Sequence, residues 1–210
     1  VYDSIIQAFR IAENPKVLLP IMVGLDGFTL SHTLENVSVV PDDVIRKFVG
    51  VRPIPHVFTH EGKTVPFKLD SQNPMTMGPI ALQNYYFEFK RQQEEAMKNA
   101  LSVIKRVHDE YGGISGRTCG NGIFEAYCLE NAEIAVVCLG STAGTVKAII
   151  GELRADSVKA GLLRIRTIRP FPVKEIIKKL ENVKAVAVMA RAMRFGGHGG
   201  PGDHEIRHVL

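Results

Sequence analysis

The stretch EIAVVCLGSTAG, residues 133–144, decides the fold of this chain. Its first seven residues are a mostly apolar run that suits a strand buried on both faces. The small residues after it turn the chain into a helix that we expect to reach residue 154. Residues 160–166 and 183–189 predict a second and a third strand, with a short helix over residues 172–180 between them. This alternation predicts right-handed βαβ units and a parallel sheet in an α/β fold.

The N-terminal half opens on a helical pattern. Apolar residues recur at helical spacing over residues 1–12, which predicts an amphipathic helix. Residues 17–23 form a continuous apolar run, which predicts another strand buried on both faces. Pro41 and the two aspartates after it predict the start of a short helix that reaches Phe48, because proline and carboxylates suit the first turn of a helix.

A proline-rich stretch follows. Residues 50–80 hold five of the eleven prolines, mixed with aromatic and apolar side chains. This composition predicts an ordered connector that lies on a surface, and we place a domain boundary within it or just after it. A long helix with one apolar stripe and one charged face is expected over residues 85–111, and Gly112-Gly113 should end it.

The composition limits the class of protein. With 45% hydrophobic and 23% charged residues, the chain is expected to be globular rather than disordered or fibrous. A formal charge of +4 without a basic cluster gives no indication of nucleic acid as a partner. No apolar run approaches the roughly 18 residues of a membrane span, so no membrane partner is expected. Three cysteines make no disulfide framework and indicate a reducing, cytoplasmic compartment.

The first residue lies inside a helical pattern. The chain opens on Val1, with neither a capping residue nor a signal-peptide pattern before the helix. We therefore interpret the chain as a piece of a longer polypeptide. The alternative is an unusual but complete protein.

The turn after the first C-terminal strand has two interpretations. Gly140, Ser141 and Thr142 lie between a predicted strand and a predicted helix, where backbone N–H groups and the helix dipole bind anions. Ser141 or Thr142 can equally cap the helix without any ligand. The turn has neither the G-x-G-x-x-G pattern nor the lysine of a phosphate-binding loop, so the cap is the favoured interpretation.

A second group of polar residues follows the predicted strand at residues 17–23. Asp26, Ser31 and His32 leave its carboxyl end, where ligands gather in open α/β sheets. They are therefore candidates for a loop near an active site. Because Ser31 and His32 are neighbours, they would face opposite ways in a strand and form no catalytic triad.

Three arginines mark the second C-terminal strand and the turn after it. Arg164 and Arg166 share one face of the predicted strand, and Arg169 precedes a Pro-Phe-Pro turn. They are expected to pair with carboxylates or to line a subunit contact. A phosphate or carboxylate site is the less favoured interpretation.

Histidines and cysteines give little indication of a metal site. His204 and His208 have the i, i+4 spacing of helical zinc pairs, and His198 precedes them, but no His-Glu-x-x-His pattern is present. The three cysteines are nine and ten residues apart and match no zinc or iron–sulfur signature. We therefore predict no metal ligands in this chain.

Four segments together resemble a known family. They are LPIMVGLDGFTLSH (residues 19–32), NPMT (73–76), GSTAGT (140–145) and GLLRIRTIRPFP (161–172). In their order and spacing they closely resemble the α subunit of the pyruvate:ferredoxin oxidoreductases, within the 2-oxoacid:ferredoxin oxidoreductase family. The last segment is also similar, more loosely, to the C-terminal domain of transketolase-like enzymes.

The resemblance implies an architecture. It makes residues 1–45 the end of a thiamine pyrimidine-binding domain and residues 46–114 a connector with a long helix. Residues 115–210 become a truncated transketolase C-terminal-like domain, which is a parallel-sheet, three-layer α/β/α fold.

The resemblance also implies an activity. The family converts a 2-oxoacid and coenzyme A to acyl-CoA, CO2 and reduced ferredoxin, using thiamine diphosphate, Mg²⁺ and iron–sulfur clusters. No catalytic residue is carried over to this chain, because the matching functions lie in other domains or subunits. We expect a scaffold and subunit contact that is inactive and cofactor-free alone, with other subunits as partners and ferredoxin reached through the complex.

One segment departs from the family pattern, and several functions stay open. Where relatives have an Asp-Arg pair after the third strand, this chain has Ala190-Arg191, followed by the glycine-rich residues 194–201. Pyruvate is the expected 2-oxoacid, with a branched-chain oxoacid as the alternative. The sequence is also compatible with the terminal domain of a transketolase or of a 2-oxoacid dehydrogenase β subunit, and with a non-catalytic interaction domain.

Overall fold

The chain folds into two compact units. The computed structural model describes residues 1–72, 74, 78 and 80–210. The N-terminal unit comprises Val1–Val23 and Val40–Val103, and the C-terminal unit comprises Gly24–Val39 and Ile104–Leu210. Of the family-like segment at residues 73–76, only Pro74 lies within the described residues. Within the described ranges, no helix combines the length and apolar character needed to cross a membrane.

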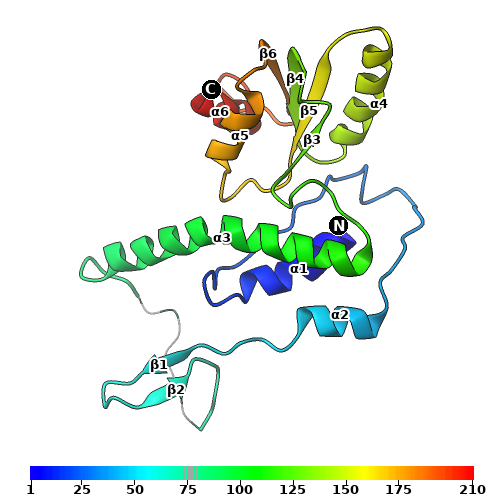
Figure 1. The fold of residues 1–210 in the computed structure, drawn as a ribbon. Coiled ribbons are helices and arrows are strands. Elements are labelled where there is room, and N and C mark those ends of the chain that lie inside the picture. Colours follow the sequence, from blue (N-terminus) through cyan, green and yellow to red (C-terminus); the bar gives the residue numbers. More distant parts are fainter. Residues whose placement is uncertain (73, 75–77, 79) are drawn as a thin grey trace. The chain divides into compact units, whose positions relative to one another are not determined.

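A four-stranded sheet forms the centre of the C-terminal unit (Figure 1). Its strands lie in the order β3 (Phe124–Tyr127), β5 (Ala160–Ile165), β4 (Ile134–Cys138) and β6 (Ala185–Met189). β4 is parallel to β5 and to β6, which confirms the three strands predicted from the apolar runs. β3 pairs antiparallel with β5 and was not predicted, because its four residues are too few for a clear pattern.

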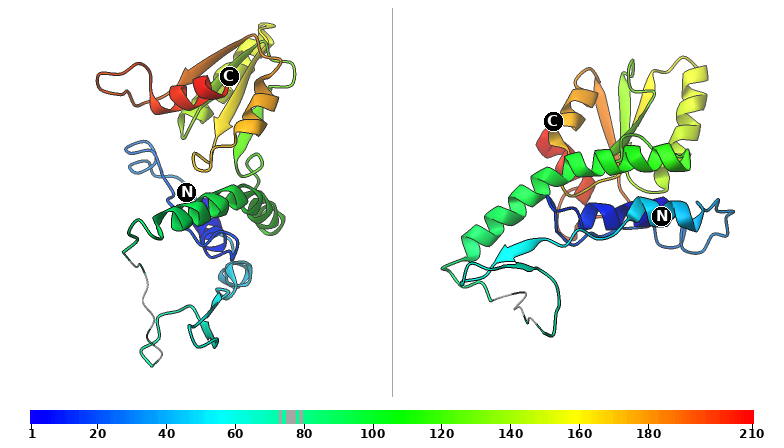
Figure 2. Two further views of the ribbon diagram at one scale, coloured as in Figure 1. Left: turned by 90° about the vertical axis from the view of Figure 1, so that its left-hand side faces the viewer. Right: turned by 60° about the horizontal axis from the view of Figure 1, so that its bottom comes forward.

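Helices cover both faces of this sheet. The chain runs from β4 through α4 (Thr142–Ala155) to β5, and then through α5 (Val173–Leu180) to β6 on the other side of β4. Two right-handed crossovers in opposite directions place α4 and α5 on opposite faces. Figures 1 and 2 show α4 on one face, with α5 and α6 (Pro201–Val209) on the other. The predicted three-layer α/β/α fold is therefore confirmed.

The core of the C-terminal unit lies between β4, β5 and the helices. Leu162 and Leu163, adjacent on β5, are both fully buried, as expected for a central strand covered on both faces. Ile150 of α4 and Ile176 of α5 are also almost completely buried. Burial of each such side chain contributes roughly 1.5–3 kcal/mol, so both helices are held mainly by their apolar faces.

The N-terminal unit is mostly helical. It contains α1 (Tyr2–Ala12), α2 (Asp42–Val49), the hairpin of β1 (His56–Phe58) and β2 (Thr64–Pro66), and the first part of α3 (Tyr86–Ser115). The buried side chains of α1 include Ile6 and Ile11, and that of α2 is Phe48. The predicted helices at residues 1–12 and 41–48 are thus confirmed, and the predicted connector contains a short hairpin.

The strand predicted at residues 17–23 is wrong. Val17 is buried, but the run after it forms no strand, and Met22 is 93% exposed. A strand needs neighbours that satisfy its backbone N–H and C=O groups. No described residue pairs with this run, so its apolar character alone does not make it a strand.

The predicted end of the long helix at Gly112-Gly113 is also wrong. α3 runs through both glycines, and Gly116, with φ of +66°, follows its last residue. A left-handed glycine at this position is a common helix stop. Gly112 serves a different purpose, since a Cβ there would lie 2.7 Å from the Thr118 methyl group. The helix needs Gly112 for close packing rather than for its end.

Candidate functional site at the carboxyl edge of the sheet

The carboxyl ends of β4 and β5 form the topological switch point of the sheet. From β4 the chain leaves toward α4 on one face, and from the neighbouring β5 it leaves toward α5 on the other. Ligands of open α/β sheets bind at such a point. The predicted turn of Gly140, Ser141 and Thr142 lies here, between β4 and α4.

Two groups of residues that were predicted separately meet at this edge. The backbone N–H of Ser141 donates a hydrogen bond of 2.5 Å to the carboxylate of Asp26, 115 residues away in the sequence. The structure therefore brings the Asp26 loop and the helix-start turn into one site.

Gly140 makes room for this contact. Its φ is +64°, a conformation that favours glycine, and a Cβ built on it would lie 2.7 Å from both carboxylate oxygens of Asp26. Any other residue at this position would both strain the turn and push the carboxylate away. The glycine predicted for the turn thus serves the Asp26 contact directly.

Asp26 takes the place that the sequence analysis gave to a serine or threonine cap. Ser141 occupies the N-cap position of α4, but its side chain makes no capping hydrogen bond to the helix. The anionic group at the start of the helix is the Asp26 carboxylate instead, where the helix dipole favours negative charge. Hydrogen bonds from the Ser141 side chain and backbone hold the pKa of Asp26 below its usual value, and the positive charges of Arg191 and Arg164 act in the same direction.

Ser31 and His32 lie in a compact turn rather than a strand. The Ser31 Oγ and His32 Nδ1 atoms are 2.7 Å apart, and the Phe28 amide donates to the Ser31 hydroxyl at 2.9 Å. The Phe28 and His32 rings stack with their centroids 5.1 Å apart. The opposite orientation expected for a strand does not apply, because residues 27–32 form a turn. These hydrogen bonds and ring contacts lie within the turn, and both rings are exposed.

A charged cluster on the α4 side of the sheet was missed by the sequence analysis. Glu125 of β3 lies directly opposite Arg164 of β5, and its carboxylate binds both Arg164 (3.4 Å) and Lys147 of α4. The Cys119 thiol donates to the same carboxylate at 3.1 Å. Glu125 reaches this cluster because β3 pairs with β5. The sequence pattern did not predict β3, so the cluster could not be predicted either.

The cluster changes the acidity of its members. Burial acts to raise the pKa of Glu125, but hydrogen bonds from Lys147, Cys119 and Arg164 outweigh it and bring that pKa below its usual value. Burial, together with the hydrogen bond to Glu125, raises the pKa of the Cys119 thiol. The carboxylate therefore stays ionised and the thiol stays protonated at neutral pH. A protonated thiol is a poor nucleophile, so the cluster is suited to structure rather than to covalent catalysis.

The three predicted arginines have different partners. Arg164 pairs with Glu125, and Arg169 pairs with Glu205 of α6 at 2.5 Å. Arg166 donates to the backbone carbonyl of Cys119 at 2.8 Å. Pairing with carboxylates is thus what the structure shows for two of the three, while their role in a subunit contact stays a prediction.

The histidines near the C-terminus lie in and before α6. His204 and His208 belong to this helix, and His198 precedes it. Across the described part of the chain, no group of three or more His, Cys, Asp or Glu side chains is placed to hold a metal ion.

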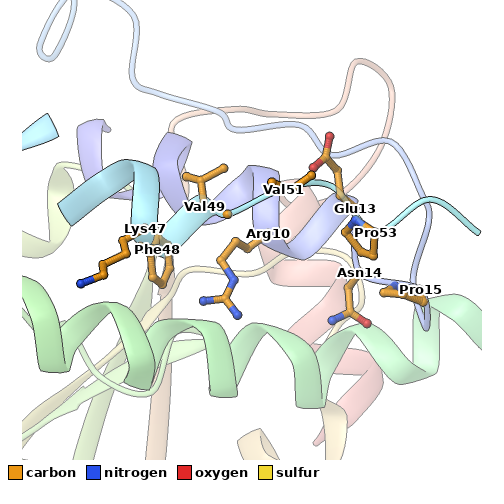
Figure 3. Close-up of a pocket in the computed structure, with 10 residues that line it drawn as sticks. Arg10, Glu13, Asn14, Pro15, Lys47, Phe48, Val49, Val51 and Pro53 are labelled. Atoms are coloured by element: carbon orange, nitrogen blue, oxygen red, sulfur yellow. The ribbon is translucent and has the colours of Figure 1, made fainter. Parts of the chain in front are cut away.

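A pocket of about 280 Å³ lies in the N-terminal unit (Figure 3). The C-terminal ends of α1 and α2 converge on it, and Arg10 and Lys47 from their last turns line it with Glu13. The Arg10 guanidinium lies 4.8 Å from the centre of the Phe48 ring. Cations at helix C-termini complement the negative end of the helix dipole, so the main effect of these charges is to stabilise α1 and α2. No motif in the sequence pointed to this pocket.

Comparison with known proteins identifies the family. The family model described as "Pyruvate flavodoxin/ferredoxin oxidoreductase, thiamine diP-bdg" matches residues 1–109, just over half of the chain. The chain belongs to the pyruvate flavodoxin/ferredoxin oxidoreductase family. A second model, described as pyruvate:ferredoxin oxidoreductase core domain II, matches residues 132–210.

Several relatives match nearly the whole chain. It is 40% identical over 99% of its length to pyruvate synthase subunit PorA of Methanocaldococcus jannaschii, and covers 51% of that protein. It is 43% identical over 93% of its length to PorA of Thermotoga maritima, covering 47% of it. Ketoisovalerate oxidoreductase subunit VorA of Pyrococcus horikoshii is 34% identical over 95% of the chain, which covers 47% of VorA. The predicted α-subunit resemblance is confirmed, and the chain spans about half the length of these relatives.

Among the described residues, the structure offers no complete set of groups for the family's thiamine diphosphate. That cofactor needs a carboxylate against its aminopyrimidine ring and metal ligands for its pyrophosphate. The pocket in the N-terminal unit offers Glu13 beside two cations that complement helix ends, and no three-ligand metal group occurs among the described residues. No chemical step is therefore assigned to the cofactor on this chain.

Proposed function

We propose that the chain is part of the α subunit of a cytoplasmic 2-oxoacid:ferredoxin oxidoreductase. This enzyme class oxidatively decarboxylates a 2-oxoacid in the presence of coenzyme A, and releases CO2, acyl-CoA and reduced ferredoxin. The observation that carries the proposal is the 40% identity to a pyruvate synthase α-type subunit over 99% of the chain.

Pyruvate is the proposed 2-oxoacid. The PorA subunits named above are 40% and 43% identical to the chain, whereas the VorA subunit of a ketoisovalerate enzyme is 34% identical. Both of the relatives named above that are at least 40% identical are PorA subunits, which supports pyruvate over a branched-chain oxoacid, although other PorA subunits are only as similar to the chain as VorA is. A comparison of the two substrates on one enzyme preparation tests this choice.

The proposed role of the chain is to support and contact other parts of the enzyme. In this proposal, residues 1–45 are the end of a thiamine-binding domain and residues 115–210 form a transketolase C-terminal-like domain. Residues 46–114 connect the two domains. In this proposal thiamine diphosphate, Mg²⁺, iron–sulfur clusters and coenzyme A bind elsewhere in the complex. Ferredoxin is reached through the partner subunits, and Arg164, Arg166 and Arg169 are candidates for the contact with them. Internal ion pairs fix the side chains of Arg164 and Arg169, whereas Arg166 binds a backbone carbonyl.

The test is reconstitution with partner subunits. We expect an affinity-tagged chain, expressed in its native host, to copurify with subunits that carry thiamine diphosphate and iron–sulfur clusters. The assembled enzyme should reduce ferredoxin with pyruvate and coenzyme A faster than with 2-oxoisovalerate, and the chain alone should be inactive. A chain that copurifies with no such subunit, or an enzyme that prefers the branched substrate, would contradict the corresponding part of the proposal.

A further inference from the structure

Residues 24–39 pack on a different unit from the residues on either side of them in the sequence. The chain leaves the N-terminal unit after Val23, packs residues 24–39 on the C-terminal unit, and returns at Val40. On its return it is fixed at once, because Val40 is buried and its amide donates to the Tyr2 hydroxyl at 3.2 Å. The excursion is therefore a defined segment with its own points of attachment.

One point of attachment lies near the end of the segment. The carbonyl of Ser38 accepts a hydrogen bond of 2.6 Å from Nη1 of Arg117. Nη2 of Arg117 donates to the hydroxyl of Tyr111 at 3.3 Å, and Tyr111 is only 1% exposed. Ser38 is therefore held by Arg117, and Arg117 is held in turn by Tyr111, whose side chain lies in the core of the C-terminal unit.

The other point of attachment is Asp26, near the start of the segment. Its carboxylate accepts from the Ser141 amide at the beginning of α4, in the space left by the absent side chain of Gly140. The Phe28–His32 turn comes directly after it, and its hydrogen bonds are internal. Phe28 itself is 75% exposed, so its ring does not hold the turn on the sheet. The position of the turn therefore depends on Asp26.

We propose that Asp26 is a positioning residue: by binding Ser141 at the start of α4, it docks residues 24–39 on the sheet and holds the Phe28–His32 turn beside the carboxyl end of β4. Gly140 and Ser141 form the site that Asp26 binds: Gly140 leaves room for the carboxylate, and Ser141 donates its amide to it. Ser31 and His32 then occupy a fixed place near the switch point of the sheet. The proposal concerns this chain's own fold and stands independently of the 2-oxoacid that the enzyme uses.

Hydrogen exchange tests the docking directly. In Asp26→Asn, the Ser141 amide and the hydrogen-bonded amides of the turn, those of Phe28 and His32, should exchange roughly tenfold faster, because the neutral amide oxygen of Asn accepts a weaker hydrogen bond than the carboxylate. The control is Asp109→Asn, which makes the same charge change at an exposed site on α3 in the same unit. It should leave both regions at the wild-type rate. Equal exchange of residues 24–39 in the wild type and Asp26→Asn would overturn the proposal.

A second variant removes the hydrogen-bond donor of Asp26 without changing the charge of the chain. Ser141→Pro deletes both the amide donor and the hydroxyl, and the φ of −68° at this residue is one that proline adopts. We expect the same faster exchange of residues 24–39, with the helical circular dichroism of the chain retained. Wild-type protection of the segment in this variant would count against Asp26 as the anchor.

Chemical rescue separates docking from simple stabilisation of the helix. In Asp26→Ala, added formate should refill the anion position at the start of α4 and restore protection of the Ser141 amide. It should not restore residues 24–39, because formate is not joined to them. If formate protected the segment as well, the segment would be held by the stability of α4, and the positioning role would be wrong.

Discussion

Glu125 shows how much a single residue of a four-residue strand can hold together. Its side chain is 14% exposed and joins β3 to α4 through Lys147 and to β5 through Arg164. A carboxylate in this position stays ionised because both cations are close, and each cation in turn loses its partner if the charge is removed. Removal of one member of such a group costs more than the group contributes as a whole.

We therefore predict that Glu125→Gln lowers the free energy of unfolding by about 1–2 kcal/mol, because two partly buried cations lose their counter-charge. The control is Glu133→Gln, whose carboxylate also binds two lysines, Lys159 and Lys184, but at an exposed site. That change should leave the free energy of unfolding close to the wild-type value, because exposed ion pairs contribute little. Urea denaturation of the wild type and the two variants measures these free energies of unfolding. If both variants lost the same stability, partial burial of Glu125 would not explain its effect.

The three cysteines should react at different rates. Cys128 is exposed, Cys138 is buried, and Cys119 is half-buried against Glu125. Burial raises the pKa of both the Cys119 and the Cys138 thiol, so little reactive thiolate is present near pH 8. We expect a thiol reagent to modify Cys128 first, and the other two at rates set by unfolding. Peptide mapping of the alkylated chain checks the order, and rapid labelling of Cys119 in folded protein would contradict it.

At the scale of elements, the end of α3 offers a matched pair of glycines. Gly112 and Gly113 are neighbours in the same helix, but a Cβ on Gly112 would lie 2.7 Å from Thr118, whereas one on Gly113 would meet nothing within 4 Å. Alanine favours a helix interior over glycine by roughly 0.5–1 kcal/mol. Gly113→Ala should therefore stabilise the chain by about that amount.

Gly112→Ala should instead destabilise it, since the gain in helix propensity is smaller than the cost of displacing Thr118 and the chain around it. Thermal melting followed by circular dichroism at 222 nm compares the two variants with the wild type. A stabilising Gly112→Ala would show that the Thr118 side chain moves freely, and that Gly112 is not required for packing.

The same elements show what the sequence could and could not predict. The parallel strands and their helices followed from long apolar runs, because a central strand such as β5 is buried on both faces. The run at residues 17–23 has the same apolar pattern, but no described strand pairs with it. Whether a segment finds a partner strand depends on the rest of the fold and cannot be deduced from the segment alone. The Asp26–Ser141 contact joins residues 115 positions apart. Both loops were suspected, but only the folded chain brings them together.

At the scale of the molecule, four carboxyl groups of the C-terminal unit have lowered pKa values. Asp26, Glu125, Glu133 and Glu175 all belong to the C-terminal unit. Each is paired in the fold, as in the 2.7 Å contact between Glu175 of α5 and Lys105 of α3. Acid should therefore act on the C-terminal unit through a definite set of carboxylates.

The direction of this pH effect follows from the lowered pKa values. A carboxyl group whose pKa is lower in the folded than in the unfolded chain stabilises the fold fully above its unfolded value, here 3.8 for Asp and 4.5 for Glu. That contribution is lost as the pH falls through the folded pKa. We predict that the stability of the C-terminal unit, followed by hydrogen exchange of β4 and β5 amides, is level above about pH 5.5 and falls progressively below about pH 4.5. In the double variant Asp26→Asn, Glu125→Gln the unit should be less stable at neutral pH and fall less steeply in acid. An equal slope in the two proteins would show that other groups cause the acid unfolding.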